Sequence, residues 1–234
     1  MSSGSPPFLV DLHVHTTGGS ADASLRPVQL GPEAWSLGLQ AVAVTEHFRV
    51  WTDYEIEALK AHSDVLILPG REYSTTLGHI LAFGVDPFPG DARDPATLFA
   101  AAERDGGLLI AAHPFRYFFR TPTQGYHPSN VRTNDPAEAA TMPIFQFVHA
   151  IEALNGHCTE EENDFALQVA TLLGLPTTAG SDAHYLDDLG RCVTGLPKSV
   201  SSVRELIEAL YSGTQELFRQ RPGQLDAHQF DRHS

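Results

Sequence analysis

Cysteine is scarce in this sequence, which has only two, Cys158 and Cys192, and no CxxC pair. Two isolated cysteines exclude a disulfide framework and a thiolate zinc site, so we expect a reduced, cytoplasmic setting. No apolar run reaches the roughly 18 residues that a membrane span needs. The first seven residues, MSSGSPP, lack the basic region and the apolar core of a secretory signal. These absences predict a globular cytoplasmic protein.

Positive charge is also in short supply. The 234 residues include 15 Lys and Arg against 29 Asp and Glu, which gives a formal net charge of -14. Such a surface repels a phosphate backbone, so long nucleic acids and anionic membranes are disfavoured as partners. A small phosphorylated substrate remains compatible, because divalent cations held by some of these carboxylates would reverse the charge locally.

No internal repeat, low-complexity tract or linker divides the chain, and strand and helix patterns alternate along it. This alternation predicts an α/β fold with parallel strands, better suited to one closed or nearly closed barrel than to two domains. We expect a barrel domain over 8–221, a disordered segment at 1–7 and a loose tail at 222–234. The expected strands are 8–15, 41–45, 65–69, 77–85, 108–112, 145–154, 176–180 and 216–220. The expected helices are 27–39, 52–62, 95–104, 160–173 and 203–211.

The first strand ends by presenting two histidines, His13 and His15, one residue apart. Side chains at i and i+2 share one face of a strand, so both imidazoles point the same way. Neutral imidazole is a good ligand for Zn, Mn, Fe or Cu. This strand end therefore predicts one side of a metal site, with two unrelated surface histidines as the alternative.

Further nitrogen and oxygen ligands follow the other predicted strands, where the active site of an α/β barrel is assembled. Together with a residue of the first loop and one at a strand start, the candidate metal ligands are His13, His15, Asp22, His47, Glu72, His79, His113, Asp182 and His184. One four-coordinate ion uses about four ligands. Nine therefore suggest two or three ions that share bridging carboxylates, an arrangement suited to phosphoester hydrolysis.

Six motifs occur in order between about residues 8 and 195, and together they resemble the PHP (polymerase and histidinol phosphatase) family. They are Asp11-Leu-His-Val-His-Thr16, Val44-Thr-Glu-His47, Pro69-Gly-Arg-Glu72, Ala112-His-Pro114, Ile151-Glu-Ala-Leu-Asn155 and Gly180-Ser-Asp-Ala-His184. The resemblance implies a distorted (β/α)7 TIM-like barrel with a trinuclear metal site and phosphoesterase activity. It implies two or three divalent ions of Zn, Mn or Fe as cofactors.

When the family's functional residues are matched motif by motif to this sequence, the resemblance implies that Glu72 is a bridging carboxylate. It also assigns Asp182 and His184 of the last motif to metal binding and catalysis. Glu46 stands where the family usually has Asp, at a position expected to support the ligands rather than bind metal. The expected catalytic residues are Asp182, His184 and His79. Each candidate also has a plain structural interpretation, such as a solvated acid for Glu72 or a packed histidine for His113 and His79. Glu152 and Asn155 are expected to support the site, whereas no motif includes His62, His127, His149, His157, His228 or His233.

A bound phosphate group needs positively charged partners besides metal ions. The guanidinium group of an arginine can donate two parallel hydrogen bonds to phosphate oxygens. We expect Arg116 and Arg71 to bind substrate, with Arg191 and Arg120 as second choices; a surface salt bridge is the alternative for each. The irregular stretch 116–144 contains Tyr117, Phe118, Phe119 and Tyr126. It is expected either to cover the site and stack on a ring of the substrate or to pack locally.

The preferred hypothesis is a metal-dependent phosphoesterase that hydrolyses a phosphomonoester or a short nucleotide substrate through a metal-bound hydroxide. A similar cluster could activate water against a carbonyl, so a hydrolase of C–N or carboxylic ester bonds is the chemical alternative. A non-catalytic metal-binding module with the same fold is the third possibility. The residues leave the metal, the substrate and the oligomeric state open.

Overall fold

The computed structural model describes residues 6–60, 62–119, 131–220 and 230–233. The expected disorder at 1–7 and the tail at 222–234 fall mainly outside these ranges, as do Arg120, Tyr126, His127 and His228. The described strands are β1 Phe8–Val14, β2 Ala41–Glu46, β3 Leu66–Thr75, β4 Gly78–Phe83, β5 Leu108–Ala111, β6 Ala150–Asn155, β7 Thr177–Gly180, β8 Cys192–Leu196, β9 Glu216–Gln220 and β10 Phe230–Arg232. The α-helices are α1 Pro27–Ser36, α2 Asp53–Lys60, α3 Pro95–Asp105, α4 Pro136–Ala139, α5 Glu160–Leu173 and α6 Val203–Tyr211.

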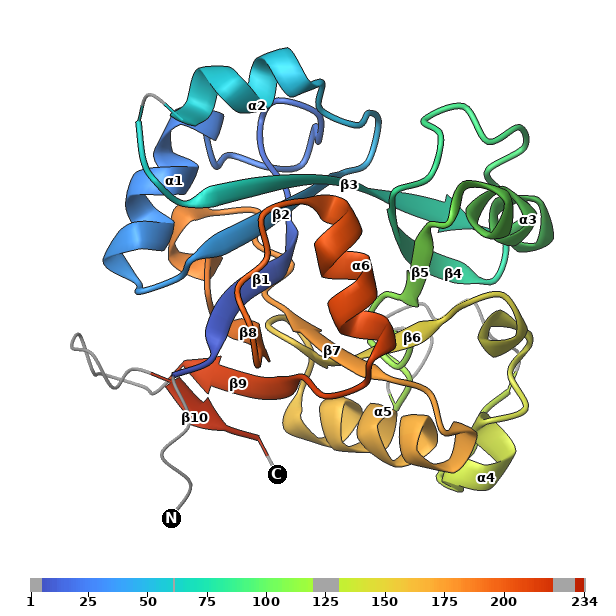
Figure 1. Cartoon of the computed structure of the whole chain (residues 1–234). Helices are drawn as coiled ribbons and strands as arrows, with labels where there is room; N and C mark the ends of the chain where they lie inside the picture. The colour runs from blue at the N-terminus through green and yellow to red at the C-terminus, as the bar shows by residue number, and fades with distance from the viewer. Residues whose placement is uncertain (1–5, 61, 120–130, 221–229, 234) are drawn as a thin grey trace.

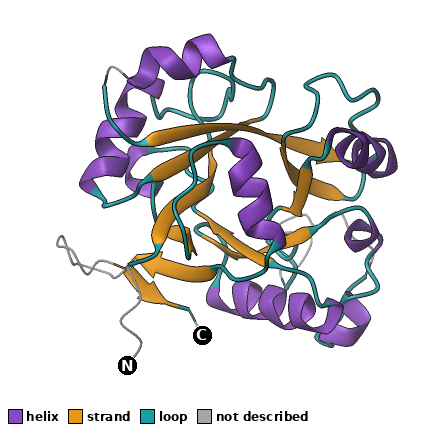
Figure 2. Ribbon diagram, in the orientation of Figure 1, coloured by secondary structure: helices purple, strands orange, loops and turns teal. Residues whose placement is uncertain are grey.

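Strands β1 to β7 curve into a barrel wall (Figure 1), and the sheet order is β10-β9-β8-β1-β2-β3-β4-β5-β6-β7. The wall closes where β1 meets the chain just beyond β7. There the His15 amide donates to the Ala183 carbonyl at 2.8 Å, and the Ala183 amide donates to the His13 carbonyl at 3.2 Å. Most helices lie outside the strands, and α6 lies across one end of the barrel (Figure 2). The expected seven-stranded α/β barrel is confirmed.

Only part of the sheet consists of the expected parallel strands. The pairs β1–β2, β2–β3, β5–β6 and β6–β7 are parallel, whereas β4 runs antiparallel to both β3 and β5. Strand β3 continues past Pro69 and turns back through a hairpin at Gly78, whose φ is +131°. A hairpin replaces the crossover helix, so the start of β4 lies at the same barrel end as the carboxyl end of β3.

Other departures from expectation lie in the second half of the chain. The expected strand 145–154 begins only at Ala150, because Pro143–Gln146 forms a 3-10 helix. The stretch 116–144 is not entirely irregular, since Asp135 caps the short helix α4. Strand β8 was not expected; it pairs antiparallel with residues 8–10 of β1. Within the described residues, no helix combines the length and apolar character that crossing a membrane requires.

A shift of register in β1 decides which side chains enter the barrel. Val10 pairs with Ala41, whereas Val14 pairs with Val44, so β1 holds one extra residue between Asp11 and Val14. Val10 and Leu12 pack in the cluster that includes α6, but Val14 packs in the cluster with α1 and α2. A bulge of this kind re-aims side chains. It turns Val14 outward and directs His13 and His15 inward.

An aromatic cluster fixes the segment that follows β5. Phe115 lies directly after the His-Pro motif and is 1% exposed. Its ring centroid is 4.9 Å from that of Phe165 on α5 and 5.1 Å from that of Phe118, both in edge-to-face geometry. Such pairs add to the free energy gained by burial. The cluster therefore anchors this segment against α5.

We expect Phe115→Ala to lower the free energy of unfolding by roughly 3–5 kcal/mol, because it leaves a cavity in a closely packed cluster. Urea denaturation followed by circular dichroism measures the change. Phe88→Ala is the matched control, since Phe88 is 88% exposed, and it should change stability by less than about 0.5 kcal/mol. Equal effects of the two substitutions would show that the cluster does not anchor the segment.

Candidate metal centre

The barrel brings the nine candidate ligands of the sequence to one end of its strands. His13 and His15 come from the end of β1, His47 follows β2, and Glu72 lies on β3. His79 begins β4 and reaches this end because of the hairpin. His113 follows β5, and Asp182 and His184 follow β7. Three groups of these side chains have ligand atoms within 4.8 Å of one another, namely His13-His15-Asp182, His13-Glu72-His113 and His15-His47-His184.

Four ligand atoms lie close together at the centre of the site. His13 Nε2 and His15 Nε2 are 3.1 Å apart. Glu72 Oε2 lies 3.5 and 3.3 Å from these two nitrogens, and Asp182 Oδ1 lies 3.4 Å from each. Ligands at about 2.0–2.1 Å from a tetrahedral Zn²⁺ are separated by about 3.3–3.4 Å. The five separations given above are therefore close to those of ligands that share one divalent cation.

The Glu72 carboxylate faces two groups of histidines with its two oxygens. Oε2 faces His13 and His15 and lies 3.1 Å from His47 Nδ1. Oε1 lies 2.8 Å from His79 Nδ1 and 3.1 Å from His113 Nε2. Asp182 Oδ2 is also 3.7 Å from His113 Nε2. The two oxygens of Glu72 thus face different sets of imidazole nitrogens, with His79 and His113 beside Oε1.

The third group surrounds the outer edge of the site. The rings of His47 and His184 both lie beside that of His15, with centroids 4.3 and 4.4 Å from it and 6.0 Å from each other. Asp22 reaches back across the glycine-rich loop, and its Oδ2 lies 3.3 Å from His47 Nε2 and 3.4 Å from His184 Nε2. This side of the site is open, since the Asp22 side chain is 59% exposed.

The buried groups shift one another's pKa values. Burial alone would raise the pKa of the Glu72 carboxyl, but positive charge on His13 and hydrogen bonds from neighbouring imidazoles hold it well below its ordinary value. Burial lowers the pKa of His13, yet nearby carboxylates, that of Glu152 foremost, raise it well above its ordinary value. The carboxylates thus stay ionised only beside positive charge. Divalent cations supply that charge and displace the imidazole protons, so the donor set fits metal ions.

Hydrogen bonds from surrounding residues orient the ligands. Glu152 on β6 accepts a hydrogen bond from His13 Nδ1 at 2.9 Å, which leaves Nε2 for the metal, and another from the His113 amide at 2.8 Å. Gly180 leaves room for this pair, since a Cβ there would lie 2.7 Å from Glu152 Oε1 and 2.5 Å from the His13 Cβ. A carboxylate behind a ligating histidine fixes its tautomer and increases its basicity. Glu152 has this role by geometry.

Glu46 organises the first loop rather than facing the ligand atoms. It is fully buried and accepts hydrogen bonds from the Thr16 hydroxyl, Trp51 Nε1 and the Ser20 hydroxyl. Ser20 Oγ lies 3.1 Å from His15 Nδ1 and accepts the His47 amide at 3.1 Å. Glu46 therefore ties the two candidate ligands His15 and His47 to one loop through Ser20.

The described non-glycine residues with positive φ are His113, Tyr117 and Asp182, at +32°, +64° and +55°. A side chain in this region of φ costs of order 1–3 kcal/mol and persists where surrounding contacts hold it. Two of the three residues are candidate ligands. The third, Tyr117, is held by its amide, which donates to Glu162 at the start of α5 at 2.6 Å.

The three expected substrate-binding arginines lie in different surroundings. Arg116 contacts the cluster directly, because its Nη1 is 2.7 Å from Asp182 Oδ2. Arg71 Nε instead donates to the His47 carbonyl at 3.3 Å, and its guanidinium stacks over Tyr73. Strand alternation places it on the opposite face of β3 from Glu72. Arg191 pairs with Asp188 at 2.8 Å.

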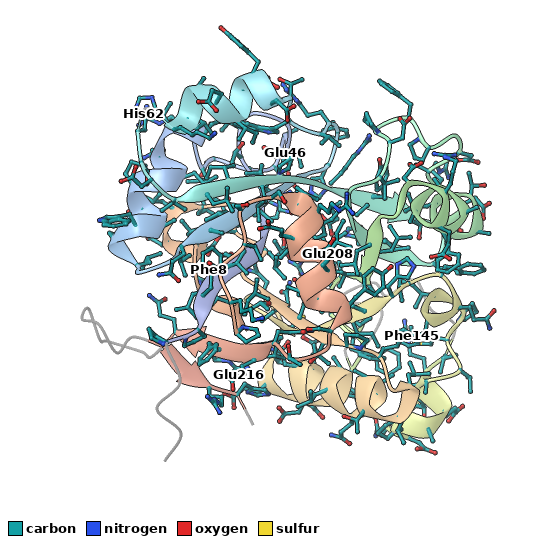
Figure 3. The ribbon with its side chains drawn as sticks, in the orientation of Figure 1. Phe8, Glu46, His62, Phe145, Glu208 and Glu216 are labelled. Atoms are coloured by element: carbon teal, nitrogen blue, oxygen red, sulfur yellow. The ribbon has the colours of Figure 1, made fainter. Side chains whose placement is uncertain are left out.

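Sequence reasoning missed two residues near the site, Ser20 and His157. The ring centroid of His157 is 6.3 Å from that of His184, and its Nε2 is 3.5 Å from Asp188 Oδ2. The one feature of the sequence that could have indicated a role for His157 is its position in the turn after Asn155. Other histidines outside the motifs lie elsewhere: His149 accepts the Leu109 amide and pairs with Glu103, and His62 is exposed at the edge of the molecule (Figure 3).

We expect Glu152→Gln to weaken metal binding by roughly 10–100-fold, because a neutral amide polarises the His13 imidazole less than a carboxylate does. Competition against a chromogenic chelator measures the affinity. The matched control is Glu161→Gln on the exposed side of α5, which should bind metal as the unmodified protein does. An unchanged affinity in Glu152→Gln would contradict the orienting role of this carboxylate.

A family model described as PHP-associated matches residues 160–214, from α5 to just beyond α6. The matched segment includes Asp182 and His184. Among curated proteins, an uncharacterized protein of Methanocaldococcus jannaschii is 26% identical over 114 residues, which cover 45% of this chain and 67% of that protein.

Several solved structures share the fold. A two-domain protein of Bacteroides vulgatus that contains a predicted PHP-like metal-dependent phosphoesterase aligns with a TM-score of 0.66 and 20% identity, over 94% of this chain and 69% of that one. An amidohydrolase of Chromobacterium violaceum aligns with a TM-score of 0.59 and 17% identity, over 90% of this chain and 97% of that one. A lesion-specific endonuclease of Pyrococcus furiosus aligns with a TM-score of 0.58 and 16% identity, over 90% of this chain and 57% of that one. The resemblance inferred from the motifs is thus confirmed: the chain has the fold of PHP-like proteins and carries a PHP-associated segment.

Proposed function

We propose that this protein is a metal-dependent phosphoesterase with a di- or trinuclear site, and that residues 8–221 form its catalytic domain. One observation carries the proposal: the buried Glu72 carboxylate lies between two sets of imidazole nitrogens, and Asp182 Oδ1 lies 3.4 Å from two nitrogens of one set. Paired cations joined by a carboxylate suit in-line displacement at phosphorus. The names of the structural neighbours agree with hydrolase chemistry.

Three groups of residues would hold the ions. His13, His15, Glu72 and Asp182 would bind the first, and Glu72, His79 and His113 the second. Asp22, His47 and His184 would bind the third. Ligands of this kind accept Zn, Mn and Fe. When bound, such ions would activate water and offset the charge that develops on the phosphoryl oxygens.

Arg116 has the best placement of the three arginines for holding a phosphoryl group. It lies beside Asp182, and within the described part of the chain its buried Nε has no hydrogen-bond partner. A guanidinium edge can donate two parallel hydrogen bonds to phosphate oxygens. We therefore propose that Arg116 orients the phosphoryl group, whereas Arg71 and Arg191 take part only if their present contacts are exchanged for substrate.

Of the three expected catalytic residues, Asp182, His184 and His79, the last is best placed to protonate the leaving oxygen of the substrate. Its side chain is 40% exposed and lines the pocket described below. Its Nδ1 faces Glu72, and its Nε2 lies only 3.4 Å from the Ser74 hydroxyl, a long contact that substrate can replace. We propose that in this role Nδ1 donates to Glu72 instead of binding the second ion, and that Nε2 carries the proton. Asp182 and His184 would then act chiefly by holding the ions and the water.

We propose a small phosphorylated compound as substrate rather than a long nucleic acid. The net charge of -14 opposes binding of a long phosphate backbone, although one neighbour in fold is an endonuclease. The two cysteines, Cys158 and Cys192, are both free, which fits the cytoplasmic setting expected from the sequence.

Loaded with Mn²⁺ or Zn²⁺, the protein should release inorganic phosphate from simple phosphomonoesters. His13→Ala and Asp182→Ala should each lower this rate to below about 1% of the original, because loss of a ligand costs more than the roughly 10–100-fold lost with an outer hydrogen-bond partner. A colorimetric phosphate assay measures the rate. His62→Ala is the control, and its activity should be unchanged.

Parallel assays with amide and carboxylic ester substrates separate this proposal from its alternatives. Hydrolysis of an amide or ester without phosphate release would favour the C–N or carboxylic ester hydrolase. Stoichiometric metal binding with no turnover of any of these substrates would favour a non-catalytic module.

A further inference from the structure

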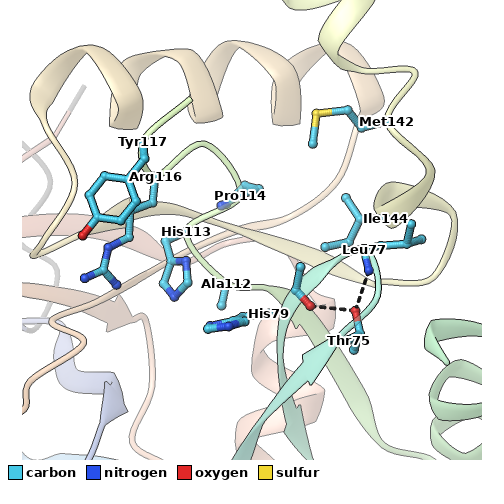
Figure 4. A pocket seen from close by; sticks show the side chains of 11 residues that line it. Thr75, Leu77, His79, Ala112, His113, Pro114, Arg116, Tyr117, Met142 and Ile144 are labelled. Atoms are coloured by element: carbon cyan, nitrogen blue, oxygen red, sulfur yellow. Dashed lines mark hydrogen bonds between the residues drawn. The ribbon is translucent and has the colours of Figure 1, made fainter. Parts of the chain in front are cut away.

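A pocket opens directly beside the candidate metal centre. Its volume is about 310 Å³, and His79 and His113 form the wall nearest the ligands. Three separate segments enclose it, namely the β3–β4 hairpin, the chain after β5, and residues 142–144 at the start of the 3-10 helix (Figure 4). This volume is at the lower end of the roughly 300–1,000 Å³ of small-molecule sites. The pocket is therefore large enough for one ring or a short branched chain.

The wall away from the ligands is apolar. It consists mainly of Leu77, Pro114, Met142 and Ile144, and none of the described residues that line the pocket carries a carboxylate. Polar groups of the hairpin form hydrogen bonds within the hairpin. The Thr75 hydroxyl donates to the Gly78 carbonyl at 2.6 Å and accepts a hydrogen bond from the Leu77 amide at 3.2 Å. A polyol or a sugar bound there would lose hydrogen bonds to water without replacing them.

Charge in the pocket is confined to the side that faces the metal centre. Arg116 lies next to Tyr117 at the end opposite Met142 and Ile144 (Figure 4). Its guanidinium is 2.7 Å from Asp182 and so lies at the boundary between the pocket and the ligand cluster. The layout is polar and cationic at one end and apolar at the other. It matches a molecule with an anionic head and a compact apolar body.

We propose that this pocket holds the organic part of the substrate, and that the substrate is a phosphate monoester of a compact apolar alcohol. The proposal rests on the phosphoesterase function proposed above. The phosphoryl group would lie between Arg116 and His79, and the apolar body would contact Leu77 and Ile144. In the reaction, a water oxygen bonds to phosphorus, the bond from phosphorus to the alcohol oxygen breaks, and that oxygen takes a proton. The products are the alcohol and inorganic phosphate.

Binding of stable phosphonates to the metal-loaded protein tests the pocket separately from turnover. Benzylphosphonate carries an apolar ring, whereas 2-hydroxyethylphosphonate offers the same head with a polar body. We expect benzylphosphonate to bind at least about 10-fold more tightly by isothermal titration calorimetry, because burial of each apolar carbon adds to affinity. Equal affinity, tighter binding of the polar compound, or no binding of either would overturn the proposal.

A variant at the pocket wall locates the preference. Leu77 is half-buried at the hairpin, and Leu77→Asn should abolish the preference for benzylphosphonate while binding of 2-hydroxyethylphosphonate stays within about 2-fold. Leu172→Asn is the matched control, because Leu172 is 60% exposed on α5, and it should keep the preference. A preference retained in Leu77→Asn would place the ring outside this pocket and contradict the assignment.

Turnover of matched esters distinguishes failure of this inference from failure of the proposed function. Benzyl phosphate and glycerol 3-phosphate are both esters of primary alcohols, and kcat/KM should favour the former by at least about 10-fold. Hydrolysis of both with equal kcat/KM would leave the phosphoesterase in place and overturn the apolar pocket. If neither ester is hydrolysed but benzylphosphonate binds tightly, the assignment of the pocket would stand and the proposed phosphoesterase activity would be wrong.

Discussion

The site depends on one physical constraint, the burial of an ionised carboxylate. Glu72 is 1% exposed, and an isolated charge at such a position is too costly to persist. Imidazoles on both sides of the carboxylate meet this cost, and each oxygen faces a different set of them. A carboxylate that demands positive charge on two sides is suited to join two cations.

The barrel meets this constraint through irregularities rather than through regular strands. The extra residue in β1 turns two histidines inward, and a second shift of register, between Glu152 and Leu154 in β6, accompanies the carboxylate behind His13. The hairpin from β3 to β4 adds His79. Backbone hydrogen bonds of Ala183 close the barrel at the level of the ligands. Bulges and unusual φ values are concentrated where they aim side chains at the centre.

Local signals in the sequence predicted local structure well. The capping box of Thr159 and Glu162 and the left-handed Gly174 define α5, and its bounds agree with those expected. His13 and His15 could be assigned to one face because two residues of one strand are involved. The direction of β4 and the existence of β8 depend on pairing partners far along the chain, so the pattern of apolar residues could not reveal them.

The candidate site shows the same division. Motif residues could be named from the sequence, and the structure brings them together, including Asp22 across its loop. The positions of Arg71 and Arg116 could not be separated, because strand alternation and the turn after β5 decide which one faces the cluster. The pocket was also beyond reach, since Leu77, Pro114 and Ile144 come from three segments that meet only in the fold.

Crystals soaked with Mn²⁺ or Zn²⁺ and measured at the absorption edge of the metal would reveal whether Glu72 joins two cations. We expect anomalous difference peaks on both sides of the Glu72 carboxylate, one of them within about 2.3 Å of His13 Nε2, His15 Nε2 and Asp182 Oδ1. A third peak is expected between Asp22, His47 and His184. A single peak that contacts only one oxygen of Glu72, or no peak near this residue, would contradict this expectation.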